Sequence, residues 1–173
     1  MDSSPKTLSP VERLLLQNQF LILAKLDPEQ KDWHEERARI VEHGFANDYH
    51  EVFTSLREGM TEQECDYVAD VLEMYGELKR AFNALEDKED ISEDSVTFSG
   101  FDGNNESSRL AYSKYLKENG KFNWVENLGT NSHGFGSRQH PAMVDRYLTL
   151  KEDLVMRPVG ASMTADEIKY VLG

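Results

Sequence analysis

The fold is decided by residues 61–86, TEQECDYVADVLEMYGELKRAFNALE. Thr61, followed three residues later by Glu64, is a capping box, in which two side chains close the first turn of a helix. Behind it, apolar residues recur at helical spacing on two sides of the same helix. One side holds Cys65, Val68, Ala69, Leu72 and Tyr75, and the other holds Val71, Met74, Leu78, Ala81 and Leu85. We therefore predict a long central helix near residues 61–86 that packs against neighbours on both sides.

Start signals of the same kind mark further helices. Ser9, Pro10 and Glu12 predict a helix over residues 10–26, and its apolar residues cover so much of its circumference that it should be largely buried. Shorter patterns predict helices that end near Gly44, lie near residues 49–56 and 105–119, and begin at Pro141 and Thr164. The predicted fold is all-α, an irregular multihelical array of about six to seven helices rather than a symmetric bundle.

The domain organisation follows from length and composition. A chain of 173 residues is long enough for one domain with its own core. We expect residues 1–8 to be a disordered lead and residues 9–173 to form a single helical domain. The acidic stretch 86–94 leaves open a division into two closely packed subdomains, residues 9–86 and 95–173.

The charge balance excludes several classes of partner. The net charge is −13 and the basic residues are scattered, which disfavours nucleic acid, because phosphate binding needs clustered Lys and Arg. The same charge disfavours an anionic membrane surface, and no apolar run approaches the ~20 residues of a membrane span. Cys65 is the single cysteine and the first ten residues lack a signal peptide's apolar core, so a cytoplasmic location is predicted.

Two glycine-aromatic segments interrupt the helical pattern, at residues 96–103 (VTFSGFDG) and 131–137 (NSHGFGS). Irregular segments of this kind often carry the functional site, and glycine allows backbone shapes that other residues resist. We predict a ligand pocket between these segments and two amides of the helix 10–26. Its predicted residues are Asn18 and Gln19 as hydrogen-bonding groups, Phe98, Phe101 and Phe135 as walls, and Asp102 and His133 as polar contacts.

Each of these residues also has a plainer interpretation. Asn18 and Gln19 could lock their helix to loop backbone, and His133 could bond a carbonyl and hold its own loop. A catalytic interpretation makes His133 a general base and Asp102 its orienting partner in a hydrolase. The sequence predicts no cofactor and no metal, because it has no HExxH motif, and Ser107 and Ser113 occupy the glycine and glutamate positions of an EF-hand loop beginning at Asp102.

An ordered set of short motifs resembles the YfbU family of bacterial proteins. It comprises Gln17-Asn18-Gln19-Phe20 with Leu26-Asp27-Pro28, Glu73-Met74-Tyr75 with Leu78, Val96-Thr97-Phe98 with Gly100-Phe101-Asp102, and His133-Gly134-Phe135. The resemblance covers residues 9–172 and implies a compact all-helical domain. It brings no established activity or catalytic residues. Some relatives look like fusions to a helix-turn-helix DNA-binding domain, which suggests a ligand-sensing or regulatory role.

Three functional hypotheses follow. The first is a cytoplasmic regulatory or small-ligand-binding module that forms a homo-oligomer and contacts neither nucleic acid nor membrane directly. The second is an enzyme of the hydrolase type that uses His133 and Asp102, and whether the chain catalyses any reaction is left open. The third is a structural module that binds other proteins through an apolar patch.

Overall fold

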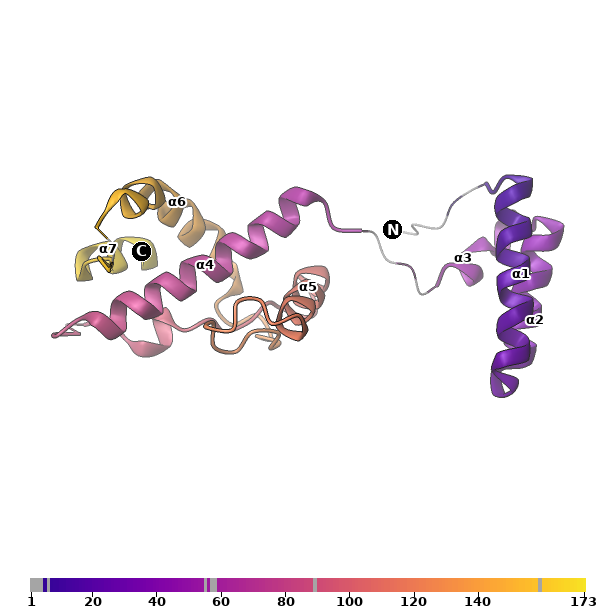
Figure 1. Ribbon diagram of the computed structural model, residues 1–173, viewed down its shortest axis with the longest axis horizontal. Helices are drawn as coiled ribbons and strands as arrows, with labels where there is room; N and C mark the ends of the chain where they lie inside the picture. The colour runs from indigo at the N-terminus through magenta and orange to yellow at the C-terminus, as the bar shows by residue number, and fades with distance from the viewer. Residues whose placement is uncertain (1–4, 6, 55, 57–58, 89, 159) are drawn as a thin grey trace. The chain divides into compact units, whose positions relative to one another are not determined.

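The computed structural model describes residues 5, 7–54, 56, 59–88, 90–158 and 160–173. Most of residues 1–8, which we expect to be a disordered lead, lies outside the described residues. Within them the chain forms seven α-helices joined by loops and short 3₁₀ turns (Figure 1). The helices are α1 (Pro10–Leu26), α2 (Lys31–His43), α3 (Tyr49–Val52), α4 (Glu62–Ala84), α5 (Ser107–Glu118), α6 (His140–Met156) and α7 (Ala165–Leu172). The prediction of an all-α multihelical fold is confirmed.

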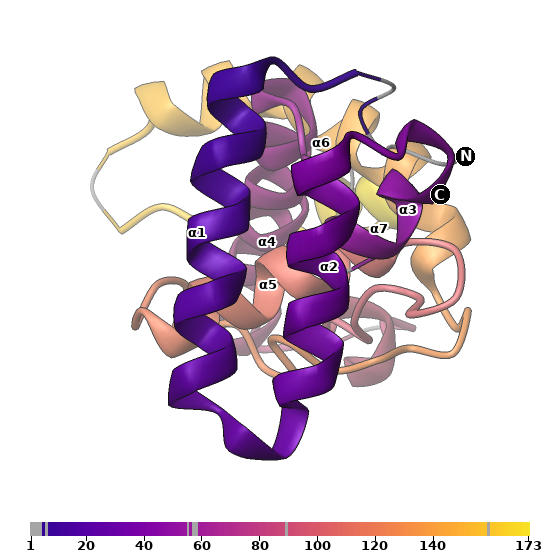
Figure 2. The ribbon, with the colours of Figure 1, turned by 90° about the vertical axis from the view of Figure 1, so that its right-hand side faces the viewer.

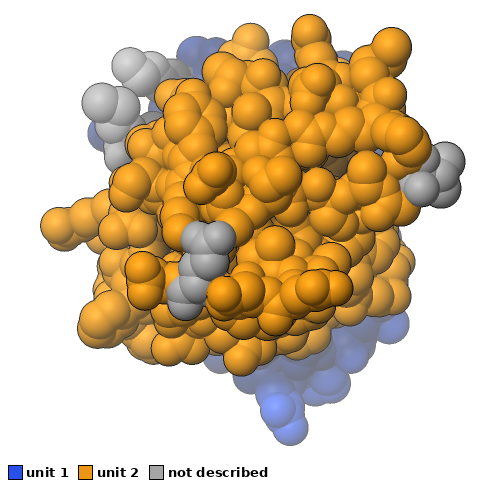
Figure 3. Space-filling view, turned by 90° about the vertical axis from the view of Figure 1, so that its left-hand side faces the viewer, with its two compact units in different colours: residues 1–59 blue, residues 60–173 orange. Residues whose placement is uncertain are grey.

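The chain divides into two compact units, Met1–Gly59 and Met60–Gly173, which Figure 3 shows in different colours. They are not the subdomains suggested by the acidic stretch, because the whole of α4 belongs to the second unit. A single domain over residues 9–173 stays a prediction. No helix in the described part of the chain combines the length and apolar character needed to cross a bilayer.

Capping boxes set the starts of three helices. The hydroxyl of Ser9 accepts a hydrogen bond from the Glu12 amide, and the Glu12 carboxylate accepts one from the Ser9 amide. Thr61 and Glu64 make the same reciprocal pair at the start of α4. Thr164 does so at α7 with Glu167. These pairs satisfy amides that a helix leaves without internal partners, so the short motifs fix where each helix begins.

In the first unit, α1 and α2 lie side by side as a hairpin (Figure 2). The small core holds Ile40, Val41, Tyr49 and Val52, against which Leu16 and Phe20 pack.

The prediction that the helix 10–26 is largely buried is wrong for the structure. Ala24 is the one residue of α1 that is buried. Within the first unit α2 covers a single side of α1, so the other apolar side chains have no neighbour there.

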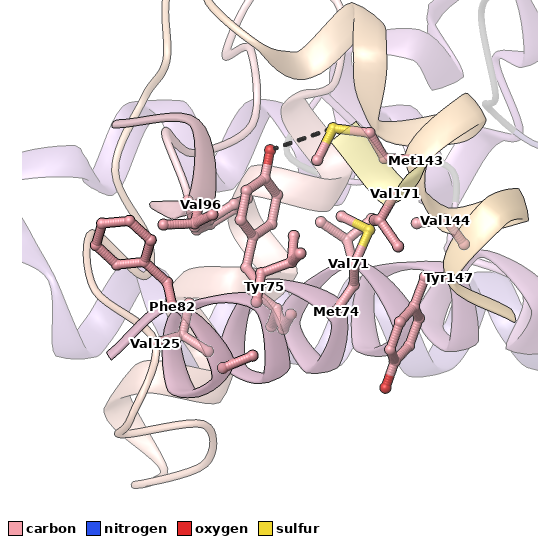
Figure 4. Close-up of a cluster of buried hydrophobic side chains, with 14 of the residues drawn as sticks. Val71, Met74, Tyr75, Phe82, Val96, Val125, Met143, Val144, Tyr147 and Val171 are labelled. Carbon is pink, nitrogen blue, oxygen red and sulfur yellow. Dashed lines mark hydrogen bonds between the residues drawn. The ribbon is translucent and has the colours of Figure 1, made fainter. Parts of the chain in front are cut away.

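In the second unit the core is built on α4, as predicted. Eight of its residues are buried: Val68, Val71, Leu72, Met74, Tyr75, Leu78, Ala81 and Phe82. Figure 4 shows side chains of α6 and α7, among them Met143, Tyr147 and Val171, packed near one end of the drawn part of α4. Val96 and Val125, from the loops, lie toward its other end. The Tyr75 hydroxyl donates to the Met143 sulfur at 3.8 Å, which gives the buried phenol a polar contact.

Four aromatic rings pack together where the first glycine-aromatic segment joins this core, and two of them belong to that segment. His140 lies 5.5–5.7 Å, between ring centroids, from Tyr75, Phe98 and Phe101. The two phenylalanine rings are 5.3 Å apart and meet edge to face, a favoured aromatic geometry. The imidazole of His140 is fully buried, and neither ring nitrogen has a hydrogen-bond partner among the described residues. We call Tyr75, Phe98, Phe101 and His140 the ring cluster.

The ring cluster gives the protein a specific acid sensitivity. Burial lowers the pKa of His140 from 6.5 to about 4. Two smaller effects oppose each other, because the charge of Glu106 raises this pKa and the charge of Arg109 lowers it. Between these pH values the unfolded chain holds a proton on this residue and the folded chain does not. The free energy of unfolding should therefore fall by about 3 kcal/mol as pH drops from 6.5 to 4, and this contribution should level off below pH 4.

Urea unfolding at a series of pH values tests this expectation. His140→Phe should remove this part of the slope between pH 6.5 and 4, whereas His133→Gln, at an exposed histidine, should keep it. An unchanged slope in His140→Phe would contradict a buried, uncharged imidazole.

Candidate functional site

The two glycine-aromatic segments, 35 residues apart at their starts by sequence, lie against each other in the second unit. Phe101 and Asn131 form a single parallel β-bridge. In it the Ser132 amide donates to the Phe101 carbonyl at 3.1 Å. The loops thus join through backbone as well as side chains, so the second segment is held by the first.

The Asn131 side chain strengthens this junction. Its carbonyl oxygen accepts from the amides of Gly103 and His133, each at 2.9 Å. The second bond helps to hold His133 in a left-handed conformation (φ 52°), which is uncommon outside glycine. Farther along, the Ser99 hydroxyl donates to the Phe135 carbonyl at 2.7 Å. Asn131 therefore holds the end of the first segment, at Gly103, and the turn at His133 in the second segment.

Gly100 is required by this close approach. Its φ is +100°, and a Cβ placed there would lie 2.1 Å from the Thr130 carbonyl oxygen, far inside contact distance. The neighbouring atoms are backbone and cannot rotate aside. The glycine in the motif thus reflects packing of chain on chain.

The predicted site residues divide by exposure. Phe98 and Phe101 are buried in the ring cluster, and Asp102 is buried beside them. His133 is exposed, and Phe135 is exposed over 78% of its surface. The two phenylalanines therefore support the segment from below, whereas Phe135 and His133 face outward.

Asn18 and Gln19 lie on α1, in the first unit, and both are exposed. The other five predicted residues belong to the second unit. A part for the two amides in a ligand site stays a prediction.

Asp102 is held as a carboxylate. Its Oδ1 accepts from the Asn104 amide at 3.0 Å and its Oδ2 from the Asn105 side chain at 2.5 Å. These two bonds, with a smaller attraction to His133 and Arg138, hold the pKa of Asp102 below its usual 3.8. Among the described residues no hydrogen bond joins Asp102 to His133. The carboxylate is thus ionised and close to two basic side chains, but it does not orient an imidazole.

A cleft of about 350 Å³ opens beside this carboxylate. It is lined by Asp102, Asn105, Glu106, Ser137, Arg138 and Pro141. A second hollow of about 220 Å³ shares Asn105 and Glu106 and extends to Ser107, Ser108 and Arg109 at the start of α5. Both hollows lie within the second unit.

Of the six residues that line this cleft, sequence reasoning predicted Asp102 alone and missed the other five, among them Arg138 and Asn105. Arg138 is exposed and forms no ion pair with any described residue, whereas Arg109 is paired with Glu106 at 2.7 Å. No motif marks Arg138, which follows the second segment by one position. Its importance comes from position alone, because the folded loops bring a free guanidinium to the edge of a cleft with a carboxylate.

Within the described residues, no three His, Cys, Asp or Glu side chains converge as a metal site would require. The chemistry that the cleft offers is hydrogen bonding and charge from Asp102, Asn105, Glu106, Ser137 and Arg138, with Glu106 already paired with Arg109.

The junction can be tested at Gly100, with Gly160 as a matched control. Both have positive φ, +100° and +92°, but no atom of the described residues lies within 4 Å of a Cβ added at Gly160. Gly160→Ala should cost about 1 kcal/mol for the left-handed backbone alone. Gly100→Ala should cost several kcal/mol more, because backbone at Thr130 must move. Equal losses in chemical denaturation would show that the close approach does not constrain the fold.

The comparison with protein families agrees with this arrangement of helices and loops. A family model described as the YfbU domain matches residues 6–173, which is nearly the whole sequence. The motifs that carry the earlier resemblance include Gly100, Phe101, His133 and Gly134, which lie at or beside the junction of the two loops. The chain belongs to the YfbU family.

Proposed function

We propose that this protein is a regulatory module that binds a small polar metabolite in the cleft beside the joined loops. The observation that carries the proposal is that two opposite charges line the same cleft. One is the ionised, buried Asp102, and the other is Arg138, which has no ion-pair partner among the described residues. Binding sites combine a few convergent polar groups with a concave surface, and this cleft does so. A cytoplasmic location belongs to the same proposal and rests on the single cysteine, Cys65.

The cleft's chemistry favours a ligand with an acidic group at one end. A guanidinium binds a carboxylate or phosphate through two parallel hydrogen bonds, so Arg138 suits such a group. Asp102 and Asn105 offer acceptor oxygens for an amine or hydroxyl at the other end. Phe135, on the neighbouring turn, is exposed but is not among the residues that line the cleft. A ligand that carries both groups would satisfy the two charges together.

The hydrolase alternative has less support. It needs Asp102 to orient His133, but among the described residues no hydrogen bond joins the two side chains, and the Asp102 carboxylate accepts hydrogen bonds from Asn104 and Asn105. The net charge of −13 disfavours direct binding of nucleic acid, so any contact with DNA would be made by a partner protein.

A thermal-shift screen of metabolites tests the proposal. A ligand that binds only the folded protein raises its apparent stability by about 2.7 kcal/mol at a hundredfold excess over its dissociation constant. We expect hits among compounds that carry a carboxylate or phosphate together with an amine or hydroxyl. The response should be lost in Arg138→Ala and weakened in His133→Ala.

Arg39→Ala is the matched control, because Arg39 is an exposed arginine on α2, outside the cleft, and its loss should leave the response unchanged. A screen without hits, or hits that survive Arg138→Ala, would contradict the proposed site. Hits that bind equally well with and without an acidic group would contradict the role given to Arg138.

A further inference from the structure

The outward side of α1 is an apolar stripe that its own unit leaves uncovered. Its exposed residues are Val11, Leu14, Leu15, Leu21, Ile22 and Leu26. Val11, Leu15 and Ile22, with Asn18 between the last two, follow the alternating four- and three-residue spacing of a coiled-coil seam. Leu15 is 60% and Ile22 56% exposed, although they lie in the middle of a helix. Exposed leucines in this pattern are typical of a helix that packs against another helix.

Asn18 lies at the midpoint of this stripe and of α1, which runs from Pro10 to Leu26. Its side chain makes no hydrogen bond with the described residues. A single asparagine in an apolar helix seam characteristically fixes the register of the pairing, because its amide must meet another polar group. The carboxamide carries both a donor and an acceptor, so two copies of it can bond to each other.

We propose that the outward stripe of α1 is a two-fold interface with a second copy of this chain, in which the two α1 helices run antiparallel. When Asn18 meets Asn18 of the second copy, Leu15 comes opposite Leu21 and Leu14 opposite Ile22, by counting equal steps from the centre. The four large apolar residues nearest the centre of the stripe then face one another, and Val11 lies opposite the aliphatic stem of Lys25. An isologous interface requires this kind of self-complementarity.

The charges on α1 point to the same occupant. The chain carries −13 overall, so two copies repel over most of their surfaces. α1 contains a single acidic residue, Glu12, whose carboxylate is engaged with Ser9 in the capping box. The charged residue on the stripe is Lys25. The stripe is therefore a place where two acidic chains can approach without repulsion between carboxylates.

The size of the stripe sets the expected strength. A helix of 17 residues is about 25 Å long, and one such helix per copy lies at the small end of stable interfaces. We expect a monomer–dimer equilibrium with a dissociation constant of roughly micromolar size. The inference is independent of the cleft in the second unit. It assigns the Asn18 amide to a second copy rather than to a ligand.

Cross-linking tests the antiparallel register in the full chain, on a Cys65→Ser background. Asn18→Cys lies at the two-fold centre and should form a disulfide with its own copy under mild oxidation. Val11→Cys should not, because two such positions lie about 21 Å apart along antiparallel helices. A mixture of Val11→Cys and Lys25→Cys should cross-link between the two variants, because these positions lie opposite each other in this register. Self-coupling of Val11→Cys as fast as that of Asn18→Cys would overturn the antiparallel arrangement.

Sedimentation equilibrium tests the surface itself. Ile22→Glu puts a carboxylate near the centre of the stripe and should weaken association at least 100-fold. Val155→Glu is the matched control, since it adds the same charge at an apolar residue of α6 that is 75% exposed, and it should leave association unchanged. A wild-type protein that is monomeric at 100-fold above micromolar concentration, or equal effects of the two variants, would overturn the proposal. Neither result bears on metabolite binding.

Discussion

The packing of Phe98 and Phe101, from the first glycine-aromatic segment, against Tyr75 and His140 is the constraint on which the second unit depends. Phe98 and Phe101 come from an irregular segment, Tyr75 from α4 and His140 from α6. Their rings meet in one place, so the segment is anchored to two helices although it has no regular structure of its own. The polar cost of this anchor is the imidazole of His140, which is buried without a hydrogen-bond partner among the described residues.

Anchoring the first segment also orders the second. The Phe101 carbonyl and the Asn131 side chain link the loops, and Gly100 lets the two backbones approach closely. Asp102 follows Phe101 directly, which places its carboxylate at the edge of the core beside the cleft. The proposed ligand site is thus a consequence of core packing, because the same four rings that stabilise α4 and α6 position Asp102.

The sequence predicted the helices well because their signals are local. Ser9, Thr61 and Thr164 each mark a start through bonds to a residue three positions later. Burial was predicted less well where it depends on neighbours, as α1 shows, since an apolar circumference says nothing about what covers it. Arg138 could not be recognised either, because its value lies in being near Asp102 across the fold and free of an ion-pair partner, and no local pattern records that.

Native-state hydrogen exchange at the Ser132 amide tests the joined loops most directly. This amide donates to the Phe101 carbonyl across the junction, and Ser132 is buried. If the ring cluster holds both segments, the Ser132 amide should exchange nearly as slowly as amides in the middle of α4, such as that of Leu78, because it opens only with the core. Exchange at the rate of an unprotected peptide would show that the loops separate independently and that the cleft beside Asp102 is not a fixed site.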